Sequence, residues 1–357
     1  MTLPLSSAPK SICILRLSAV GDISHTLPLV RTIQTAWPQT KLTWIIGKTE
    51  YKLVSDMDQI QFILFDKSQP MRSYLNIARQ LRQQYFDVLI HLQMSLRASL
   101  LSLLVKSPIK LGFDKQRAKD MQWLFTNHQI TYQPQQHVID SFLGFSQCLG
   151  ITTPHYEWSI PIPQHDLDFA KQTLSHNQPV IVISPCSSMA YRNWSINGYA
   201  KIADYAQQKY GAQIVLCGGP SDIEQQYGQS IMQQTACSPV NLIGKTSLKQ
   251  LLAILKQAQL VVAPDAGPAH LANAVGTPVI GLYATTNPDR ARPYCYPEYV
   301  VNRYPEAVKA KYGQSITDLP WGIRVRDEGT MARIQVQDVT DMIDKFFLTT
   351  QTTGQPS

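Results

Sequence analysis

The chain has 357 residues, 44% of them hydrophobic and 16% charged, so it is long enough for two globular domains with buried cores. This composition excludes a single small module and a disordered or low-complexity chain. The net charge of +7 indicates an anionic partner, but charge alone does not choose between nucleic acid, a phosphorylated small molecule and an anionic membrane.

The six cysteines form no CxxC pair, which argues against a zinc site or a disulfide framework and favours a reduced, cytoplasmic compartment. The opening MTLPLSSAPK lacks the charged and apolar regions of a secretory signal. The apolar run at residues 99–105 is far shorter than the roughly 20 residues that a bilayer span needs. We therefore expect a cytoplasmic protein that does not cross a membrane.

In the first half, short apolar runs alternate with helix-like stretches. Strands are predicted at residues 11–17 (SICILRL), 41–47 (KLTWIIG) and 86–92 (FDVLIHL), and helices at 23–37 and 95–105. This alternation predicts β-α-β units with a parallel sheet. We expect a Rossmann-like domain over residues 1–160.

The pattern restarts after the Pro-rich and aromatic link ITTPHYEWSIPIPQHD. Strands are predicted at residues 180–185, 212–219, 259–265 and 278–284, which gives a second α/β domain over residues 161–332. An amphipathic helix and a polar tail would complete residues 333–357. The expected fold class is α/β, with two Rossmann-like domains facing each other across a cleft.

Ligands of such sheets bind beyond the carboxyl ends of the strands, so the strand-to-helix junctions are the places to look for chemistry. After the first strand, LSAVGDISHTLP brings Gly21, Asp22 and His25 to one junction. Asp22 could act as a general base or could cap the helix that begins near Ile23. The residues alone leave both interpretations open.

Two junctions of the second domain suit phosphate. ISPCSSMAYR offers the hydroxyls of Ser187 and Ser188 and the planar donor fork of Arg192. VVAPDAGPAH places Asp265 at a strand end and His270 one turn into a helix whose N-terminus could bind a diphosphate. The alternatives are a loop-and-cap serine pair, a solvated arginine, an N-cap aspartate and a packed core histidine.

Other motifs limit the chemistry. In LCGGPSD, Asp222 could accept from a ribose diol or could belong to a turn, and Thr246 in NLIGKTS is a cap or backbone-contact position. That stretch is not a P-loop, because Pro239 stands where its first glycine is required. No GxGxxG follows a strand, the Asp56-x-Asp58 pair has no second acidic cluster, and no helix-turn-helix signature is present. We therefore expect no dinucleotide cofactor, no metal and no nucleic-acid partner.

Taken in order, the motifs LSAVGDISHTLPLVRTI, SSMAYRNWSINGYAKIA, GGPSD, LIGKTSL and DAGPAHLANAVGTPVIGLY resemble those of the heptosyltransferases of glycosyltransferase family 9, over about residues 11 to 295. The resemblance implies a GT-B fold whose C-terminal helix crosses back to the first domain. It also implies inverting, metal-independent transfer of L-glycero-D-manno-heptose from ADP-heptose to the Kdo of inner-core lipopolysaccharide. No cofactor besides this donor substrate is implied.

The resemblance also assigns residues. Asp22 matches the catalytic base, and the donor would be bound by Ser187, Ser188, Arg192, Asp222, Thr246, Asp265, Ala266, Gly267 and His270. Arg192 stands where many relatives have Lys, Asp222 where they have Glu, and Ala266-Gly267-Pro268 where they have Thr-Gly-Leu, so the phosphate loop has lost a hydroxyl.

The first domain is expected to bind the acceptor, a Kdo-lipid A with or without phosphate on the Kdo. Residues 97–119 contain six basic residues and one acid, which suits phosphates and carboxylates, although a solvated basic face would look the same. The expected acceptor contacts are Gly21, His25, Arg97, Arg117 and His137. Such an acceptor implies peripheral attachment to the cytoplasmic face of the inner membrane of a Gram-negative bacterium.

Two alternatives remain open. A related family member could add a later heptose or another sugar, because sugar selectivity depends on a few contacts. A nucleotide-sugar-binding protein without turnover would keep the donor site and lose the chemistry, but the intact Asp22 argues against it.

Overall fold

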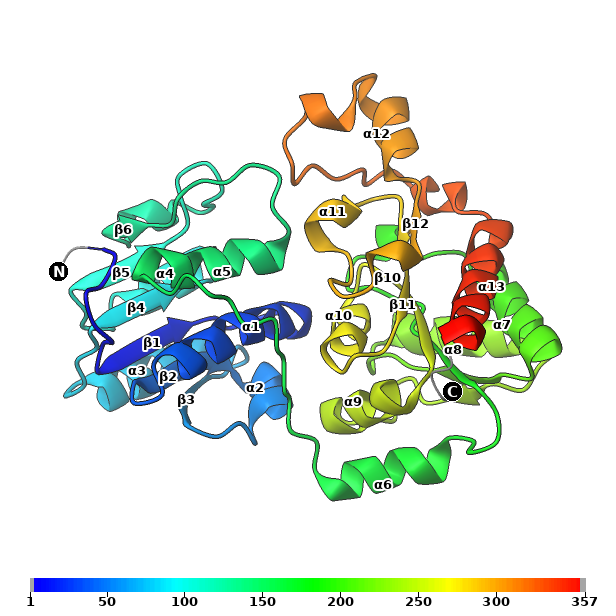
Figure 1. Cartoon of the computed structure of the whole chain (residues 1–357), viewed down its shortest axis with the longest axis horizontal. Coiled ribbons are helices and arrows are strands. Elements are labelled where there is room, and N and C mark those ends of the chain that lie inside the picture. The colour runs from blue at the N-terminus through cyan, green and yellow to red at the C-terminus, as the bar shows by residue number, and fades with distance from the viewer. Residues whose placement is uncertain (1–2, 354–357) are drawn as a thin grey trace. The chain divides into compact units, whose positions relative to one another are not determined.

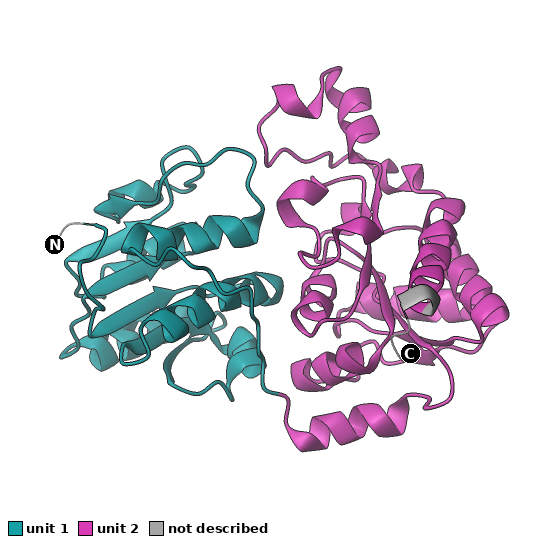
Figure 2. Ribbon diagram, viewed as in Figure 1, with its two compact units in different colours: residues 1–161 teal, residues 162–357 magenta. Residues whose placement is uncertain are grey.

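The computed structural model describes residues 3–353 and divides the chain into two compact units, the first ending at Pro161 and the second beginning at Ile162 (Figure 2). The division falls within the link that the sequence indicated. Each unit has its own parallel sheet and its own buried core.

The first unit contains a parallel sheet of six strands in the order β3-β2-β1-β4-β5-β6 (Figure 1). The strands are β1 (Ser11–Leu15), β2 (Lys41–Gly47), β3 (Ile60–Phe65), β4 (Val88–His91), β5 (Ile109–Gly112) and β6 (His128–Gln129). The helices are α1 (Val20–Ala36), α2 (Lys48–Val54), α3 (Pro70–Leu81), α4 (Leu96–Ser102), α5 (Val138–Leu149) and the short 3-10 turn η1 (Gln122–Leu124).

The central strands of this sheet are buried on both faces, which is why they read as continuous apolar runs. Cys13 and Leu15 of β1 pack in one cluster with the inner faces of α3 and α4. Helices α1 and α5 pack against each other. Because side chains alternate along a strand, Ile12 and Ile14 point to the opposite face of the sheet from Cys13 and Leu15.

The second unit repeats this design with six parallel strands in the order β12-β11-β10-β7-β8-β9. The strands are β7 (Val180–Ile183), β8 (Gln213–Leu216), β9 (Val240–Asn241), β10 (Leu260–Pro264), β11 (Val279–Tyr283) and β12 (Val300–Asn302). The helices are α6 (Gln164–Thr173), α7 (Ile196–Tyr210), α8 (Asp222–Gln234), α9 (Leu248–Gln257), α10 (Gly267–Ala274), α11 (Pro288–Ala291), α12 (Tyr304–Tyr312) and α13 (Val336–Thr353), with 3-10 turns η2 (Ala190–Arg192), η3 (Pro297–Tyr299), η4 (Ile316–Asp318) and η5 (Thr330–Arg333).

Numbered within its own unit, each sheet has the strand order 3-2-1-4-5-6 of a Rossmann fold. The order reverses between β1 and β4 in the first unit and between β7 and β10 in the second. Ligands of open α/β sheets bind at such reversal points, beyond the carboxyl ends of the strands. The predicted α/β class with two Rossmann-like domains is therefore confirmed.

The C-terminal helix α13 packs on α7, β11 and β12 of the second unit. Its return to the first unit stays a prediction. Tyr205 and Lys209 of α7 both donate to the Asp344 carboxylate, and the Trp194 indole donates to the Ile334 carbonyl at 2.9 Å. The helix continues to Thr353, into the polar tail, whose residues 354–357 lie outside the described residues.

Candidate functional site

Asp22 follows the central strand β1 and lies in the first turn of α1, at the third helical position and not at the N-cap, which is Ala19. One carboxylate oxygen, Oδ2, accepts from the Ala19 backbone N–H at 3.1 Å and from the Arg16 guanidinium at 2.6 Å. The other oxygen, Oδ1, lies 3.9 Å from Nδ1 of His25, and the side chain is 39% exposed. The carboxylate is therefore fixed through one oxygen and open to solvent.

Arg16 is the buried partner that holds Asp22. Its side chain is 8% exposed, it donates to the Leu92 carbonyl at 2.6 Å, and its guanidinium lies 5.4 Å from the centre of the Phe142 ring. These contacts leave the guanidinium little freedom to turn away from Asp22. The pairing places a permanent cation beside the carboxylate at the point where the strand order reverses.

Gln93 fixes the loop between β1 and α1. It follows β4, and its side-chain oxygen accepts from the backbone N–H groups of Leu17 and Ser18, each at 3.2 Å. This side chain from one strand end therefore holds the loop that follows the neighbouring strand. The loop in turn positions the first turn of α1 and Asp22.

Two predicted acceptor residues that are far apart in sequence lie together. His25 of α1 and His137 are both buried, and their ring centres are 6.3 Å apart in an edge-to-face arrangement. His137 is also the N-cap of α5, because its Nδ1 accepts from the Ile139 backbone N–H at 3.2 Å. Gly21 is buried in α1 beside Asp22.

The two predicted acceptor arginines differ in their surroundings. Arg97 is exposed on α4. Arg117 pairs with Asp114 and donates to the Gln136 amide oxygen at 2.8 Å, the Ser141 hydroxyl at 2.9 Å and the Thr131 carbonyl at 3.0 Å. Arg117 therefore holds the segment that carries His137.

In the second unit, Asp265, Arg192 and His270 form a buried cluster at the reversal between β7 and β10. The Asp265 carboxylate lies 3.2 Å from Nη1 of Arg192 and 3.4 Å from Nε2 of His270. Arg192 comes from η2 after β7, and His270 from α10 after β10. The fold thus brings together the predicted donor junctions after β7 and after β10, which are far apart in the sequence but follow neighbouring strands.

The pKa of Asp265 is set by two opposing effects. Burial raises the pKa of this carboxyl, but the hydrogen bond from His270 and the positive charge of Arg192 outweigh it and lower the pKa to about 2. Asp265 is therefore a carboxylate at any physiological pH. Nε of Arg192 has no hydrogen-bond partner among residues 3–353.

The start of α10 is suited to an anion. Its N-cap is Ala266, whose side chain accepts no hydrogen bond, and the next residues are Gly267 and Pro268. The backbone N–H groups and the positive dipole end of α10 therefore have no competing side-chain cap. Asp265 itself precedes the N-cap, so the capping interpretation of this residue is wrong.

Ser187 and Ser188 lie in the loop between β7 and η2. Ser187 is half-buried, its backbone N–H donates to the Asn193 side chain at 2.7 Å, and its hydroxyl accepts from the Met189 N–H at 3.4 Å. Ser188 is exposed. Both serines therefore lie on the segment that leads to Arg192.

The remaining donor residues lie at the ends of β8 and β9. Asp222 is exposed at the first position of α8, whose N-cap is Ser221. The neighbouring Glu224 accepts from the Gly219 N–H at 2.8 Å and from the Ser221 hydroxyl at 2.7 Å, which fixes the Gly218–Gly219 turn. Thr246 precedes Ser247, which is the N-cap of α9, so Thr246 is not the cap.

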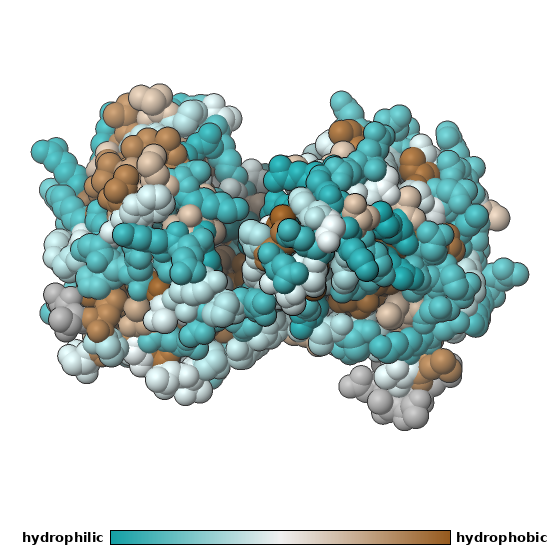
Figure 3. All heavy atoms as spheres, turned by 90° about the horizontal axis from the view of Figure 1, so that it is seen from above, coloured by the Kyte–Doolittle hydropathy of each residue, from teal (hydrophilic) through white to brown (hydrophobic). Residues whose placement is uncertain are grey.

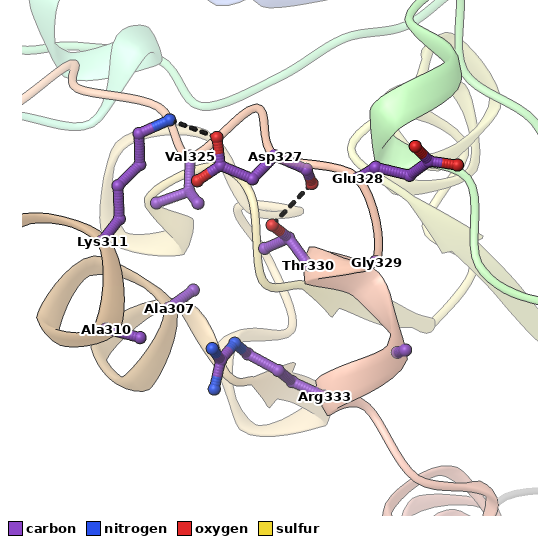
Figure 4. A pocket seen from close by; sticks show the side chains of 10 residues that line it. Ala307, Ala310, Lys311, Val325, Asp327, Glu328, Gly329, Thr330 and Arg333 are labelled. Atoms are coloured by element: carbon purple, nitrogen blue, oxygen red, sulfur yellow. Dashed lines mark hydrogen bonds and ion pairs between the residues drawn. The ribbon is translucent and has the colours of Figure 1, made fainter.

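A separate pocket of about 420 Å³ lies between α12 and residues 325–333, and none of the predicted site residues lines it (Figure 4). Lys311 and Asp327 form an ion pair of 2.5 Å at its rim. The residues of η5, which line the pocket, contact η2, which carries Arg192.

Within residues 3–353, no group of three or more His, Cys, Asp and Glu side chains is arranged to hold a metal ion, and no helix is long and apolar enough to cross a membrane.

Sequence reasoning missed three of the polar residues described above: Arg16, Gln93 and Glu224. Arg16 and Gln93 could have been found from sequence, because each directly follows a buried apolar run. A polar residue at that position lies at the carboxyl end of a strand, where ligands of such sheets bind. Glu224 had none beyond its position in the first turn of a helix.

Comparison with known proteins bears on this arrangement. A family model described as glycosyltransferase family 9 (heptosyltransferase) matches residues 74–317. The lipopolysaccharide core heptosyltransferase OpsX of Haemophilus influenzae is 41% identical over 343 residues, which is 96% of this chain and 99% of that protein.

Two solved structures share the fold. A family 9 glycosyltransferase from Veillonella parvula has a TM-score of 0.78 at 21% identity and covers 95% of this chain and 97% of its own. The heptosyltransferase WaaC of Escherichia coli, solved with ADP, has a TM-score of 0.71 at 19% identity and covers 94% of this chain and 99% of its own.

Proposed function

The chain belongs to glycosyltransferase family 9, the heptosyltransferases, and from this we propose that it transfers L-glycero-D-manno-heptose from ADP-heptose to the Kdo of inner-core lipopolysaccharide. It is a glycosyltransferase with the GT-B fold of two Rossmann-like domains. The observation that supports the proposal most strongly is the 41% identity, over nearly all of both chains, to a relative named as a lipopolysaccharide core heptosyltransferase.

The second unit would bind ADP-heptose. The open N–H groups of Ala266 and Gly267 would hold the diphosphate at the positive end of α10. Arg192, whose Nε has no partner among the described residues, would donate to a phosphate oxygen, and Ser187 and Ser188 would add hydroxyl donors. This positive charge would stabilise the departing ADP without a metal ion.

The other donor contacts would involve the nucleoside and the sugar. Asp222 would accept from the ribose hydroxyls, and the backbone near Thr246 would contact adenine. Asp265 would accept from heptose hydroxyls, while the contact with His270 keeps its carboxylate in place. His270 would thus belong to the donor site through Asp265.

In the first unit, Asp22 would act as the general base. Its Oδ1 would take the proton of the Kdo hydroxyl as that oxygen attacks the anomeric carbon from the face opposite ADP. The bond between the anomeric carbon and the diphosphate oxygen breaks, the electron pair leaves with ADP, and the anomeric configuration inverts. Arg16 would keep Oδ2 occupied, so that the proton goes to the exposed oxygen.

The acceptor would be a Kdo-lipid A, with or without phosphate on the Kdo, at the cytoplasmic face of the inner membrane. Gly21, His25 and His137 would contact it directly, because Gly21 and His25 lie beside Asp22 on α1 and the His25 ring meets that of His137. Arg97 is free to reach its anionic groups from the surface of α4, whereas Arg117 would act by holding the His137 segment.

The test is release of ADP by the purified protein given ADP-heptose and Kdo-lipid A, with Asp22→Asn measured beside it. We expect ADP only when both substrates are present, and loss of about a thousandfold in turnover in the variant with unchanged donor binding. Release only with an already heptosylated acceptor would identify a later heptose transfer. Donor binding without turnover on any acceptor would identify a binding protein.

A further inference from the structure

Helices α3 and α4 cover one face of the first sheet and turn an unusual outer surface to solvent. Their inner sides are buried through Ile77 and Leu81 of α3 and Ala98 and Leu101 of α4. The helices lie side by side, because the Tyr74 hydroxyl of α3 donates to the Arg97 carbonyl of α4 at 2.7 Å. The outer surface of this pair is called the α3–α4 face below.

The α3–α4 face carries large apolar side chains. Met71 and Leu75 are one helical turn apart on α3, and Leu96, Leu100 and Leu103 form a stripe at spacings of four and three residues along α4 and its C-cap. These five side chains are between 46% and 73% exposed. Figure 3 shows brown, hydrophobic side chains gathered at the surface of the first unit among teal, hydrophilic ones. An apolar cluster of this kind marks an interaction surface.

The same face is basic. Arg72, Arg79 and Arg82 lie within the outward quadrant of α3 together with Met71 and Leu75, and all three are exposed. Arg72 and Arg79 donate to the neutral side chains of Gln69 and Asn76. Across residues 70–103, which contain both helices, the sequence has four Arg against one Asp and no Glu. The charge of this face is therefore complementary to an anionic surface.

Apolar side chains interleaved with cations on two adjacent helices match the chemistry of a phospholipid headgroup layer. The leucines can enter the boundary between headgroups and acyl chains while the arginines bind lipid phosphates. A folded protein partner would not require this density of uncompensated positive charge. We propose that the α3–α4 face docks the enzyme onto an anionic lipid bilayer.

The position of the face in the fold fits this role. Helix α4 begins just after β4, the neighbour of β1, so Leu96 lies at the same carboxyl edge of the parallel sheet as Asp22. A lipid held in the bilayer would therefore present its headgroup sugar toward the edge that carries the base. This step, and only this one, rests on the proposed lipid acceptor.

The test is flotation of the full-length protein with vesicles of phosphatidylethanolamine containing about a quarter phosphatidylglycerol, without any sugar substrate, since the surface charge then comes from lipid alone. We expect binding that weakens with salt and is lost on pure phosphatidylcholine. The triple variant Leu96→Gln, Leu100→Gln and Leu103→Gln should bind at least tenfold less tightly. Replacing Arg72, Arg79 and Arg82 with Gln should weaken binding on the order of a hundredfold.

Matched controls come from the second unit. Lys201, Lys256 and Lys309 are exposed cations whose replacement with Gln removes the same charge, and Met232→Gln with Leu348→Gln removes exposed apolar surface. Both controls should bind vesicles as the wild type does. In the two variants of the α3–α4 face and in the two controls, all substituted side chains are exposed. Circular dichroism should therefore show folded protein for each of them, and turnover on a deacylated, water-soluble acceptor should stay within about twofold of the wild-type value.

Failure of the wild type to float with anionic vesicles, or equal losses in the control variants, would overturn the docking proposal and leave the transferase proposal intact. Conversely, vesicle binding that follows the α3–α4 face in a protein that transfers no heptose would leave docking intact and overturn the proposed function.

Discussion

Arg16 is the residue on which the position of the Asp22 carboxylate depends most, since it binds Oδ2 at 2.6 Å from a buried site. We expect Arg16→Gln to lower kcat by about ten- to a hundredfold with donor affinity unchanged, because the carboxylate loses its fixed orientation. Arg16→Lys should recover part of the rate. Steady-state kinetics together with calorimetric titration of ADP would separate the two quantities.

A purely structural role for Arg16 would lower the amount of folded protein and leave kcat per folded molecule unchanged. Arg31→Gln provides the control, because Arg31 is a partly buried arginine of the same unit and donates to the Ser159 carbonyl and the Gln34 side chain. Equal losses of kcat in the Arg16 and Arg31 variants would contradict a specific effect on Asp22.

We expect the free energy of unfolding of the second unit to fall at acid pH because of Asp265. Its pKa is lowered to about 2 from an ordinary 3.8, so its contribution is complete above about pH 4 and is lost as the pH falls through 2. The shift corresponds to about 2 kcal/mol of unfolding free energy. Urea unfolding of the wild type and Asp265→Asn at several pH values should show a gap at neutral pH that narrows below about pH 4. A gap independent of pH would contradict this assignment.

At the scale of a helix, His137 combines a structural role with a predicted functional one. As the N-cap of α5 it should contribute about 1 kcal/mol, so His137→Ala should destabilise the protein by that amount, and His137→Ser should restore stability because serine caps as well. If the ring also contacts the acceptor, both variants should raise the acceptor KM roughly tenfold. Recovery of both stability and KM in His137→Ser would reduce His137 to a cap.

The elements themselves were predictable to different extents. The apolar runs that become β1, β2, β4, β7, β8, β10 and β11 could be identified because strands buried on both faces are continuously apolar. The edge strands β6 and β9 were missed, because each has only two residues and no period can be recognised in so few. The stretch 60–65 that forms β3 is the other edge strand of the first sheet and has exposed side chains, which obscured its pattern.

The site was predictable as a set of junctions and not as a set of contacts. Asp22, Arg192 and Asp265 follow strand ends, which sequence can show. The hold of Arg16 on Asp22 and the meeting of His25 with His137 depend on which strands are neighbours. Which strands are neighbours is determined by the strand order of the sheet, and the apolar runs of the sequence do not predict this order.

At the scale of the whole molecule, two sheets of the same strand order carry different sets of charges at their reversal points. The first has the Asp22 carboxylate held by Arg16, and the second has Arg192 and an uncapped helix N-terminus suited to phosphate. Under the proposed function, the two tasks of a transferase, activating an acceptor and binding a charged leaving group, would be divided between two units that each have their own core.

This division predicts that ADP alone stabilises the second unit and not the first. With ADP at about a hundred times its Kd, amide hydrogen exchange in residues 185–192 and 265–270 should slow by up to about a hundredfold, because exchange through local opening must first release the ligand. Residues 18–25 around Asp22 should exchange at an unchanged rate, since their fixed contacts come from Arg16 and Gln93 of the first unit. Arg192→Gln should weaken the protection in the second unit, while Arg31→Gln should not. Protection of residues 18–25 by ADP to the same degree would mean that the nucleotide acts on both reversal points, and the division of tasks argued from the two sheets would be wrong.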